Sequence, residues 1–106
     1  MLANGHVRCT RLLLEAGADV QARGESGMTP LHRACDGGSE CMELLLKHGA
    51  NVEARDENDD TPLHTVCARG MVNCVRLLLE AGARTDVRNK YDGRTPLDNA
   101  LARRRD

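Results

Sequence analysis

The sequence predicts an all-α solenoid in which helix–turn–helix units stack in series and hairpin-like loops project from them. Three short motifs lead to this fold class, because each recurs along the 106 residues at intervals of 32 to 34 residues. A period of this length accommodates one helix pair and one connector. The motif Thr-Pro-Leu begins at Thr29, Thr61 and Thr95. The motif Leu-Leu-Leu begins at Leu12, Leu44 and Leu77. The motif Gly-Ala begins at Gly17, Gly49 and Gly82.

The most complete unit spans residues 61–82 and contains two expected helices. Thr61 suits the N-cap, because its hydroxyl can accept a hydrogen bond from an unpaired backbone N–H. Pro62 suits the first helical position, where its missing N–H costs nothing. Gly70 is expected to end this helix, and a second helix is expected over Val72–Glu80.

Apolar residues fall on one side of each helix in this unit. The stripe on the second helix is too wide for a single helix pair to cover. Each unit therefore needs a neighbour on both sides, which explains why the copies occur in series. The expected apolar positions are Leu63, Val66 and Cys67 on the first helix, and Cys74, Val75, Leu77, Leu78 and Leu79 on the second.

The rest of the chain is expected to repeat this unit within a single domain over residues 1–106. A second helix is expected over Val7–Glu15, with Leu12, Leu13 and Leu14 as its core. Further helices are expected over about Glu40–Lys47 and Thr95–Arg104. The expected divisions are a partial repeat (1–23), two repeats (24–55 and 56–89) and a second partial repeat (90–106).

The connectors between units carry turn residues. Gly24 and Gly27 favour a tight turn in the first connector. In the second connector, Asp59 stands where glycine is expected, and an aspartate tolerates the left-handed conformation better than most residues. The third connector, residues 84–94, is one residue longer and more basic, and Asp98 follows it where two other units have histidine.

Composition excludes several classes of function. The formal net charge is −1, so no global field would attract nucleic acid or an anionic membrane. Apolar runs do not exceed three residues, so no transmembrane helix is expected, and no signal peptide is recognisable. The odd number of cysteines, five, favours free thiols in a reducing cytoplasm or nucleus. They occupy two repeat positions and are expected to form columns of small buried side chains, at Cys9, Cys41 and Cys74 and at Cys35 and Cys67.

Candidate metal and catalytic groups have simpler structural interpretations. His32 with Cys35 and His64 with Cys67 have zinc-ligand chemistry, but they recur at the repeat period and should stack in a column rather than converge. Residues 24–27, GESG, resemble part of a nucleophile elbow without its last glycine, and a connector turn is favoured. No cofactor, metal or catalytic site is therefore expected.

Two charged clusters leave alternatives open. The acidic residues of 56–60 form either a solvated turn or a surface for a basic partner. Arg103, Arg104 and Arg105 form either a solvated helix end or a fragment of a nuclear-import signal.

The sequence TPLH at Thr29–His32 and at Thr61–His64, followed by a glycine and LLLxxGA, resembles the ankyrin repeat over nearly the whole chain. This resemblance implies helix pairs in a curved solenoid with loops projecting at right angles. It implies that the motif histidine bonds backbone groups and links neighbouring repeats. It also implies a module without catalytic activity that binds another protein along the concave face formed by loops and first helices.

The family's usual contact positions, transferred to this sequence, define a candidate partner-binding surface. Tyr91 and the arginines are the expected anchors, since such residues often dominate interface energetics. Met28 is expected to be exposed and to offer an adaptable apolar contact. The acidic second loop and the basic third loop suggest a partner with charges of both signs. The candidates are Arg23, Glu25, Ser26, Met28, Asp36, Gly37, Arg55, Glu57, Asn58, Asp60, Ala68, Arg69, Arg88, Tyr91, Asp92 and Arg94.

Alternatives to a simple binding module remain. Residues 34–50 and 66–83 are similar to the ankyrin-repeat and SOCS-box proteins, which implies a substrate-recruiting fragment of a cullin ubiquitin-ligase adaptor, although no SOCS box can be placed in this sequence. A designed or truncated array with no native partner is a third possibility. Self-association through exposed repeat ends is a further expectation.

Overall fold

The computed structural model describes residues 5–34 and 38–103, and six α-helices with one short 3-10 helix lie in these ranges. The α-helices are α1 (Gly5–Glu15), α2 (Pro30–Arg33), α3 (Gly38–Lys47), α4 (Pro62–Arg69), α5 (Val72–Glu80) and α6 (Pro96–Arg103). The 3-10 helix η1 spans Glu25–Gly27. No strand is assigned in the described ranges, so the all-α prediction is confirmed.

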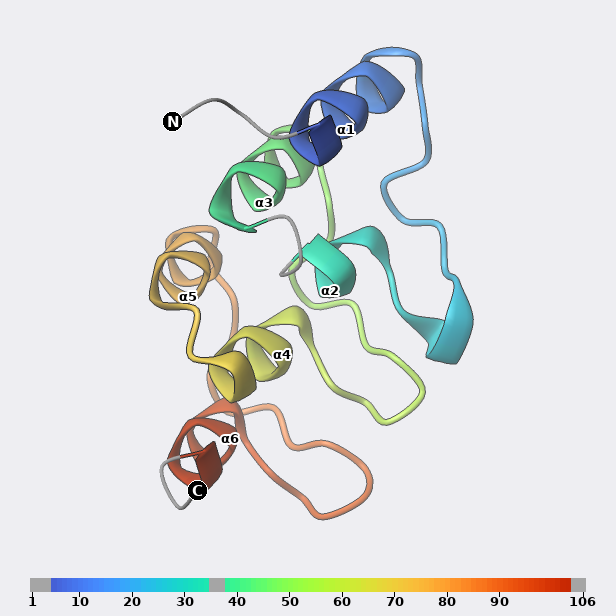
Figure 1. Cartoon of the computed structure of the whole chain (residues 1–106). Coiled ribbons are helices and arrows are strands. Elements are labelled where there is room, and N and C mark those ends of the chain that lie inside the picture. Colours follow the sequence, from blue (N-terminus) through green and yellow to red (C-terminus); the bar gives the residue numbers. More distant parts are fainter. Residues whose placement is uncertain (1–4, 35–37, 104–106) are drawn as a thin grey trace.

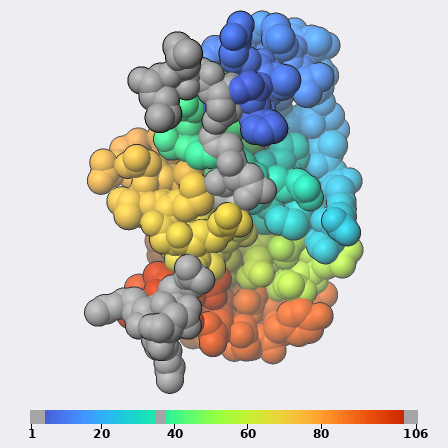
Figure 2. Space-filling model, in the orientation of Figure 1, coloured from blue at the N-terminus to red at the C-terminus, as the bar shows by residue number. Residues whose placement is uncertain are grey.

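The helices stack in series along the longest dimension of the molecule (Figure 1), and the sequence colours of Figure 2 pass from blue to red along the same direction. Helices α1, α3 and α5 follow one another as one layer, while α2, α4 and α6 lie in sequence closer to the loops. The three connectors project to the opposite side from α1, α3 and α5. The principal dimensions are 38 × 29 × 24 Å, which reflects stacking along one axis rather than packing around one centre.

Helix α4 begins and ends where its sequence predicts. The Thr61 hydroxyl accepts a hydrogen bond from the backbone N–H of His64 at 3.4 Å, and Pro62 occupies the first turn. Gly70 ends the helix in the left-handed conformation, at φ 68° and ψ 28°. Helix α5 then occupies the predicted range Val72–Glu80, so the complete unit is confirmed at both helices.

The core is aliphatic and continuous between units. Its largest fully buried apolar side chains are Leu31, Met42 and Leu78, one from each of α2, α3 and α5. They belong to a single cluster that extends from Val7 in α1 to Leu78 in α5. Burial of each such side chain stabilises the fold by about 1.5–3 kcal/mol.

The leucine triplets show that burial at one repeat position depends on the neighbouring helices. The prediction that Leu12, Leu13 and Leu14 form the core of α1 is wrong for two of them, because Leu12 and Leu13 are 65% and 61% exposed. Their counterparts in α3, Leu44 and Leu45, are buried, and α3 contacts α1, α2 and α5. Leu14 is buried against α3, together with Val7. At the other end, Leu79 was expected in the apolar stripe of α5 but is 44% exposed, since no described helix covers it.

Several helix boundaries differ from the prediction. Helix α1 begins at Gly5 rather than Val7, and α3 begins at Gly38 rather than near Glu40. The second unit is one residue shorter between Gly38 and Leu44 than the third is between Gly70 and Leu77, and this difference is not accommodated by a late start of α3. Helix α6 spans Pro96–Arg103, close to the expected range, and residue 104 lies outside the described part.

The cysteine columns are only partly buried. Cys41 and Cys74 are buried, whereas Cys9 at the same repeat position is exposed, because no described first helix covers that side of α1. Cys67 is half-buried, and its burial raises the pKa of the thiol. Cys35 lies outside the described residues. No disulfide joins the cysteines of the described ranges.

Candidate protein-binding surface

Two buried histidines position the inner helices and the loops relative to each other. The Thr61 N–H donates to His64 Nδ1 at 3.0 Å, so Nδ1 is an acceptor and the proton resides on Nε2. Nε2 lies 2.9 Å from the backbone oxygen of Arg94 in the next connector and donates to it. His32 repeats this arrangement with the Thr29 N–H and the Asp60 oxygen, at 3.2 and 2.8 Å. The expected link between neighbouring repeats is confirmed at both positions.

Asp98 occupies the histidine position in the last unit and keeps only half of this arrangement. Its Oδ2 accepts the Thr95 N–H at 3.1 Å, and its own N–H donates to the Thr95 hydroxyl at 3.2 Å. These hydrogen bonds lower the pKa of the Asp98 carboxyl group, the backbone bond contributing most. A carboxylate cannot donate to a carbonyl as the histidines do, so the cap is retained and the donor is lost.

The three projecting loops stack on each other through backbone hydrogen bonds. The Glu57 N–H donates to the Ser26 oxygen at 3.0 Å, and the Lys90 N–H donates to the Asn58 oxygen at 2.8 Å. Gly27 lies close to this contact, since a Cβ at its position would lie 3.2 Å from the Glu57 nitrogen. The loop tips therefore form one ordered surface, seen to the right of the helices in Figure 1.

Left-handed residues close the first two loops. In the first loop, Ser26 and Gly27 have φ of 59° and 70°, and the Gly24 N–H donates to the Met28 oxygen at 2.8 Å. In the second, Asp59 has φ of 61°, which confirms the left-handed conformation expected where aspartate replaces glycine. Asp56 Oδ1 accepts the backbone N–H groups of residues 58 and 60 at 2.9 and 3.0 Å. The Asp56 carboxylate therefore stabilises the turn of its own loop.

Asn89 organises the longer third loop. Its Oδ1 accepts the N–H groups of Asp92 and Arg94 at 3.3 and 3.1 Å, and its Nδ2 donates to Asp60 Oδ1 at 3.0 Å. The side chains of Arg94 and Asp92 form an ion pair at 2.9 Å. At the base of this loop, Arg84 bonds Asp86, which lowers the pKa of that carboxyl group. The Arg84 N–H also donates to Glu53 Oε2 at 2.8 Å, a further link between repeats.

Several predicted contact residues are engaged within the protein. Arg23 Nη1 donates to the backbone oxygens of Gly27 and Arg55, at 2.8 and 2.6 Å, and so links the first loop to the second. Arg88 Nη1 similarly donates to the Gly93 oxygen at 2.8 Å. Asp60 is half-buried and bonded through both its carboxylate and its backbone oxygen. Met28 was expected to be exposed but is half-buried, which corrects that expectation.

Other predicted residues present exposed side chains on the loop tips or inner helices. Tyr91 is the most exposed large apolar residue described, at 79%. Asn58, Ala68 and Arg94 are half-buried, and Asp36 and Gly37 lie outside the described residues. The exposed candidates are Glu25, Ser26, Arg55, Glu57, Arg69, Tyr91 and Asp92.

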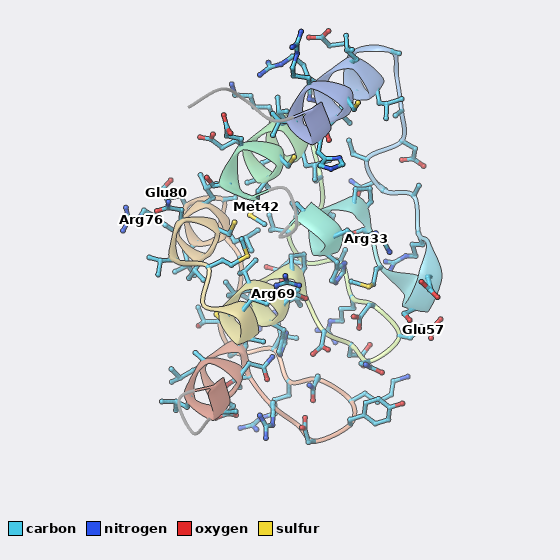
Figure 3. All side chains as sticks on the ribbon, in the orientation of Figure 1. Arg33, Met42, Glu57, Arg69, Arg76 and Glu80 are labelled. Atoms are coloured by element: carbon cyan, nitrogen blue, oxygen red, sulfur yellow. The ribbon has the colours of Figure 1, made fainter. Side chains whose placement is uncertain are left out.

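Sequence reasoning missed two exposed cations beside these candidates. Arg33 on α2 is exposed, and Figure 3 shows it on the helix next to α4, which carries Arg69. Lys90 is exposed beside Tyr91 at the third loop tip. Position 33 could have been found from the repeat alignment, because its equivalents, Thr65 and Asn99, show that it varies between units. Figure 3 also shows Glu57 at the tip of the second loop.

Within residues 5–34 and 38–103, no three His, Cys, Asp or Glu side chains form a group that could hold a metal ion. None of the helices in these ranges is long and apolar enough to cross a bilayer. The described side chains form a surface of projecting loops and inner helices suited to contact with a macromolecule.

This architecture is matched by a family model. The model for ankyrin repeats (3 copies) matches residues 1–56 and 49–106, which together cover the whole chain. The protein therefore belongs to the ankyrin-repeat family, whose repeats are protein-interaction modules.

Two curated proteins match one repeat length of the sequence. They are protein phosphatase 1 regulatory subunit 27 of Homo sapiens and of Mus musculus, each 49% identical over 35 residues. The match covers 33% of this chain and 23% of either relative, so it spans about a quarter of those proteins. A regulatory subunit among the similar proteins is consistent with a binding role.

Proposed function

We propose that this protein is a non-enzymatic interaction module that binds a partner protein across its three loop tips and the exposed side of α2 and α4. The observation that carries the proposal is the stacking of the loops by the Glu57 and Lys90 amide hydrogen bonds, at 3.0 and 2.8 Å. Because these bonds fix the tips before a partner arrives, less conformational entropy is lost on binding.

The chemistry of this surface favours one class of partner segment. Arg33, Arg55 and Lys90 are exposed cations, and Tyr91 adds an exposed aromatic ring. Glu25 and Glu57 are exposed acidic side chains on the first and second loops, whereas the carboxylates of Asp56 and Asp60 accept hydrogen bonds within the loops. The surface therefore suits a partner segment that carries charges of both signs together with apolar side chains.

Protein phosphatase 1 is the first partner to test, since the two relatives are named as its regulatory subunits. Binding of its purified catalytic subunit to the immobilised chain would be measured by biolayer interferometry. In parallel, the chain would capture partners from cell lysate. Both experiments compare the wild type with Arg33→Ala/Tyr91→Ala and with a control on the opposite layer, Arg76→Ala/Glu80→Ala.

The inner-surface variant is expected to lose the partner, and the control on α5 is expected to retain it. Figure 3 shows Arg76 and Glu80 on the side of α5 that faces away from the loops. A partner lost equally with both variants, or retained by both, would show that binding occurs elsewhere on the molecule.

The alternative function, a substrate-recruiting fragment of a cullin ubiquitin-ligase adaptor, stays a proposal, and the capture experiment tests it separately. It rests on the similarity of residues 34–50 and 66–83 to ankyrin-repeat and SOCS-box proteins. Recovery of elongin or cullin in the same capture experiment would favour a recruiting role in a ubiquitin ligase. Their absence from complexes that contain an inner-surface partner would remove it.

A further inference from the structure

The three projecting loops carry an arginine at the same position of the repeat, and the middle one is used differently. Arg23, Arg55 and Arg88 are equivalent, with spacings of 32 and 33 residues. Arg23 Nη1 donates to the Gly27 oxygen of its own loop, and Arg88 Nη1 donates to the Gly93 oxygen of its own loop, both at 2.8 Å. Arg55 is exposed, and no hydrogen bond or ion pair holds its guanidinium group among the described residues. The charge of Arg55 is therefore not used to close a loop.

The backbone around Arg55 is nevertheless held on both sides. The Arg55 oxygen accepts a hydrogen bond from Arg23 Nη1 at 2.6 Å, and the Glu57 N–H donates to the Ser26 oxygen at 3.0 Å. Between them, Asp56 Oδ1 accepts the N–H groups of residues 58 and 60. Positions 55 and 57 thus combine a fixed main chain with unbonded side-chain ends, so a partner that binds these ends orders fewer groups.

Glu57 supplies the opposite charge two positions after Arg55. Its side chain is exposed, and its carboxylate has no hydrogen bond or ion pair in the part of the chain that the structure describes, including one with Arg55. A Cβ at Gly27 would lie 3.2 Å from Glu57 Cγ, so the Glu57 side chain passes beside the first loop. Figure 3 shows Glu57 at the tip of the second loop, away from the helices. The second loop therefore offers one cation and one anion that do not neutralise each other directly.

The second loop is also the centre of the loop surface. It is hydrogen-bonded to the first loop through the Ser26 oxygen and to the third through the Lys90 N–H. Residues at the centre of an interface are the most shielded from water, and they dominate binding energetics. Tyr91, 79% exposed at the tip of the third loop, places an aromatic ring to one side of this centre.

We propose that the second loop determines which partner segment binds, with Arg55 contacting an acidic side chain and Glu57 contacting a basic one. Tyr91 contacts an apolar side chain of the same segment. This inference rests on the proposed function and names the chemistry of its partner. The guanidinium group of Arg55 suits a carboxylate, which it can bind through two parallel hydrogen bonds. A segment with charges of one sign would leave either Arg55 or Glu57 covered without a partner, which weakens binding.

Selection from a phage-displayed pool of random peptides tests this chemistry without a known partner. Peptides of about twelve residues are suitable, because an extended chain of that length spans about 40 Å and the longest dimension of the protein is 38 Å. The wild-type chain is expected to enrich peptides with an acidic, a basic and an apolar residue at fixed separations. An enriched peptide, synthesised with a fluorescent label, then gives the dissociation constant by fluorescence polarisation.

Exchange of the two charges provides the decisive variant, Arg55→Glu/Glu57→Arg. It keeps the net charge and the backbone hydrogen bonds at both positions, and its melting temperature confirms that it is folded. Like charges would meet at both contacts, so it is expected to bind the wild-type peptide at least about tenfold more weakly. It is expected to regain affinity for a peptide whose acidic and basic residues are exchanged. The apolar residue stays in place in that peptide and keeps the direction of binding.

Single truncations and a matched control complete the set. Arg55→Ala and Glu57→Ala are each expected to weaken binding about two- to fivefold. Arg76→Glu/Glu80→Arg makes the same charge exchange on the side of α5 that faces away from the loops (Figure 3), and it is expected to bind the peptide as the wild type does.

The outcomes separate this inference from the proposed function. Enriched peptides without paired opposite charges, or equal binding of the wild-type peptide to the charge-exchanged chain, would overturn the roles of Arg55 and Glu57. The proposed function would then stand, because the loops would still bind a peptide. A wild-type chain that enriches no peptide would overturn a peptide segment as the occupant, whereas the phosphatase and capture experiments decide the proposed function independently.

Discussion

Replacement of His64 by Asn tests whether the buried histidines link one repeat to the next. Asn can still accept the Thr61 N–H through Oδ1, but its shorter side chain cannot reach the Arg94 carbonyl that His64 Nε2 contacts at 2.9 Å. A carbonyl left without its partner costs about 1–3 kcal/mol. His64 is 0% exposed, so the missing ring atoms leave a void that adds about 1 kcal/mol. The expected loss in the free energy of unfolding is about 2–4 kcal/mol.

Asp98→Asn is the matched control for this experiment. It places the same residue at the same repeat position, but the Asp98 carboxylate has no proton to donate and accepts the Thr95 N–H as a cap of α6. Its effect on stability is expected to be clearly smaller. Urea unfolding followed by circular dichroism measures both variants. If the two variants lose equal stability, or if His64→Asn unfolds at the wild-type midpoint, the interpretation of the histidines as links between repeats fails.

Three further predictions concern burial and titration. Leu78→Ala is expected to cost about 2–5 kcal/mol in thermal unfolding, and Leu13→Ala less than about 0.5 kcal/mol, because only Leu78 is buried; equal losses would place the core elsewhere. Iodoacetamide at pH 8 is expected to alkylate exposed Cys9 before Cys67, whose thiol pKa is raised by burial, with peptide mass spectrometry reporting each site; faster labelling of Cys67 would contradict this. The pKa of Asp98 is lowered by folding, so its stabilising effect is present above the unfolded pKa and lost as the pH falls through the folded value. Asp98→Asn is therefore expected to show a weaker fall in melting temperature below about pH 4, and an identical acid profile would argue against the cap.

The sequence predicts helices well where the capping residues are local. Helix α5 occupies its predicted range, and α4 begins after Thr61 and ends at Gly70 as expected. These features depend on interactions within a few residues of the chain, so the motif is sufficient to identify them. The start of α3 at Gly38 was missed, because the second unit is one residue shorter and its helix boundary depends on how the two helices pack.

The burial of apolar side chains at the ends of the solenoid could not be predicted from the repeat motif. Leu12 and Leu77 occupy the same repeat position, yet Leu12 is 65% exposed and Leu77 is half-buried. The motif assigns both to the core, whereas exposure is decided by whether a neighbouring helix is present.

The composition of the binding surface was also only partly predictable. Arg23 was expected to contact a partner, but it bonds the backbone of Arg55, 32 residues away in sequence. Asp60 likewise bonds Asn89 of the next loop. Such long-range bonds between loops depend on the stacking geometry, which the residue types alone do not specify. Arg33, by contrast, could have been recognised as a variable position of the repeat.

The placement of aromatic residues makes Tyr91 an intrinsic optical probe. Tyr91 is the single aromatic side chain of the protein, and it lies 79% exposed at the tip of the third loop rather than in the core. Its fluorescence should therefore respond when a macromolecule covers the loop tips, yet change little when the aliphatic interior loosens. Emission and circular dichroism recorded on one sample would separate occupancy of the loops from unfolding of the helices without any attached dye.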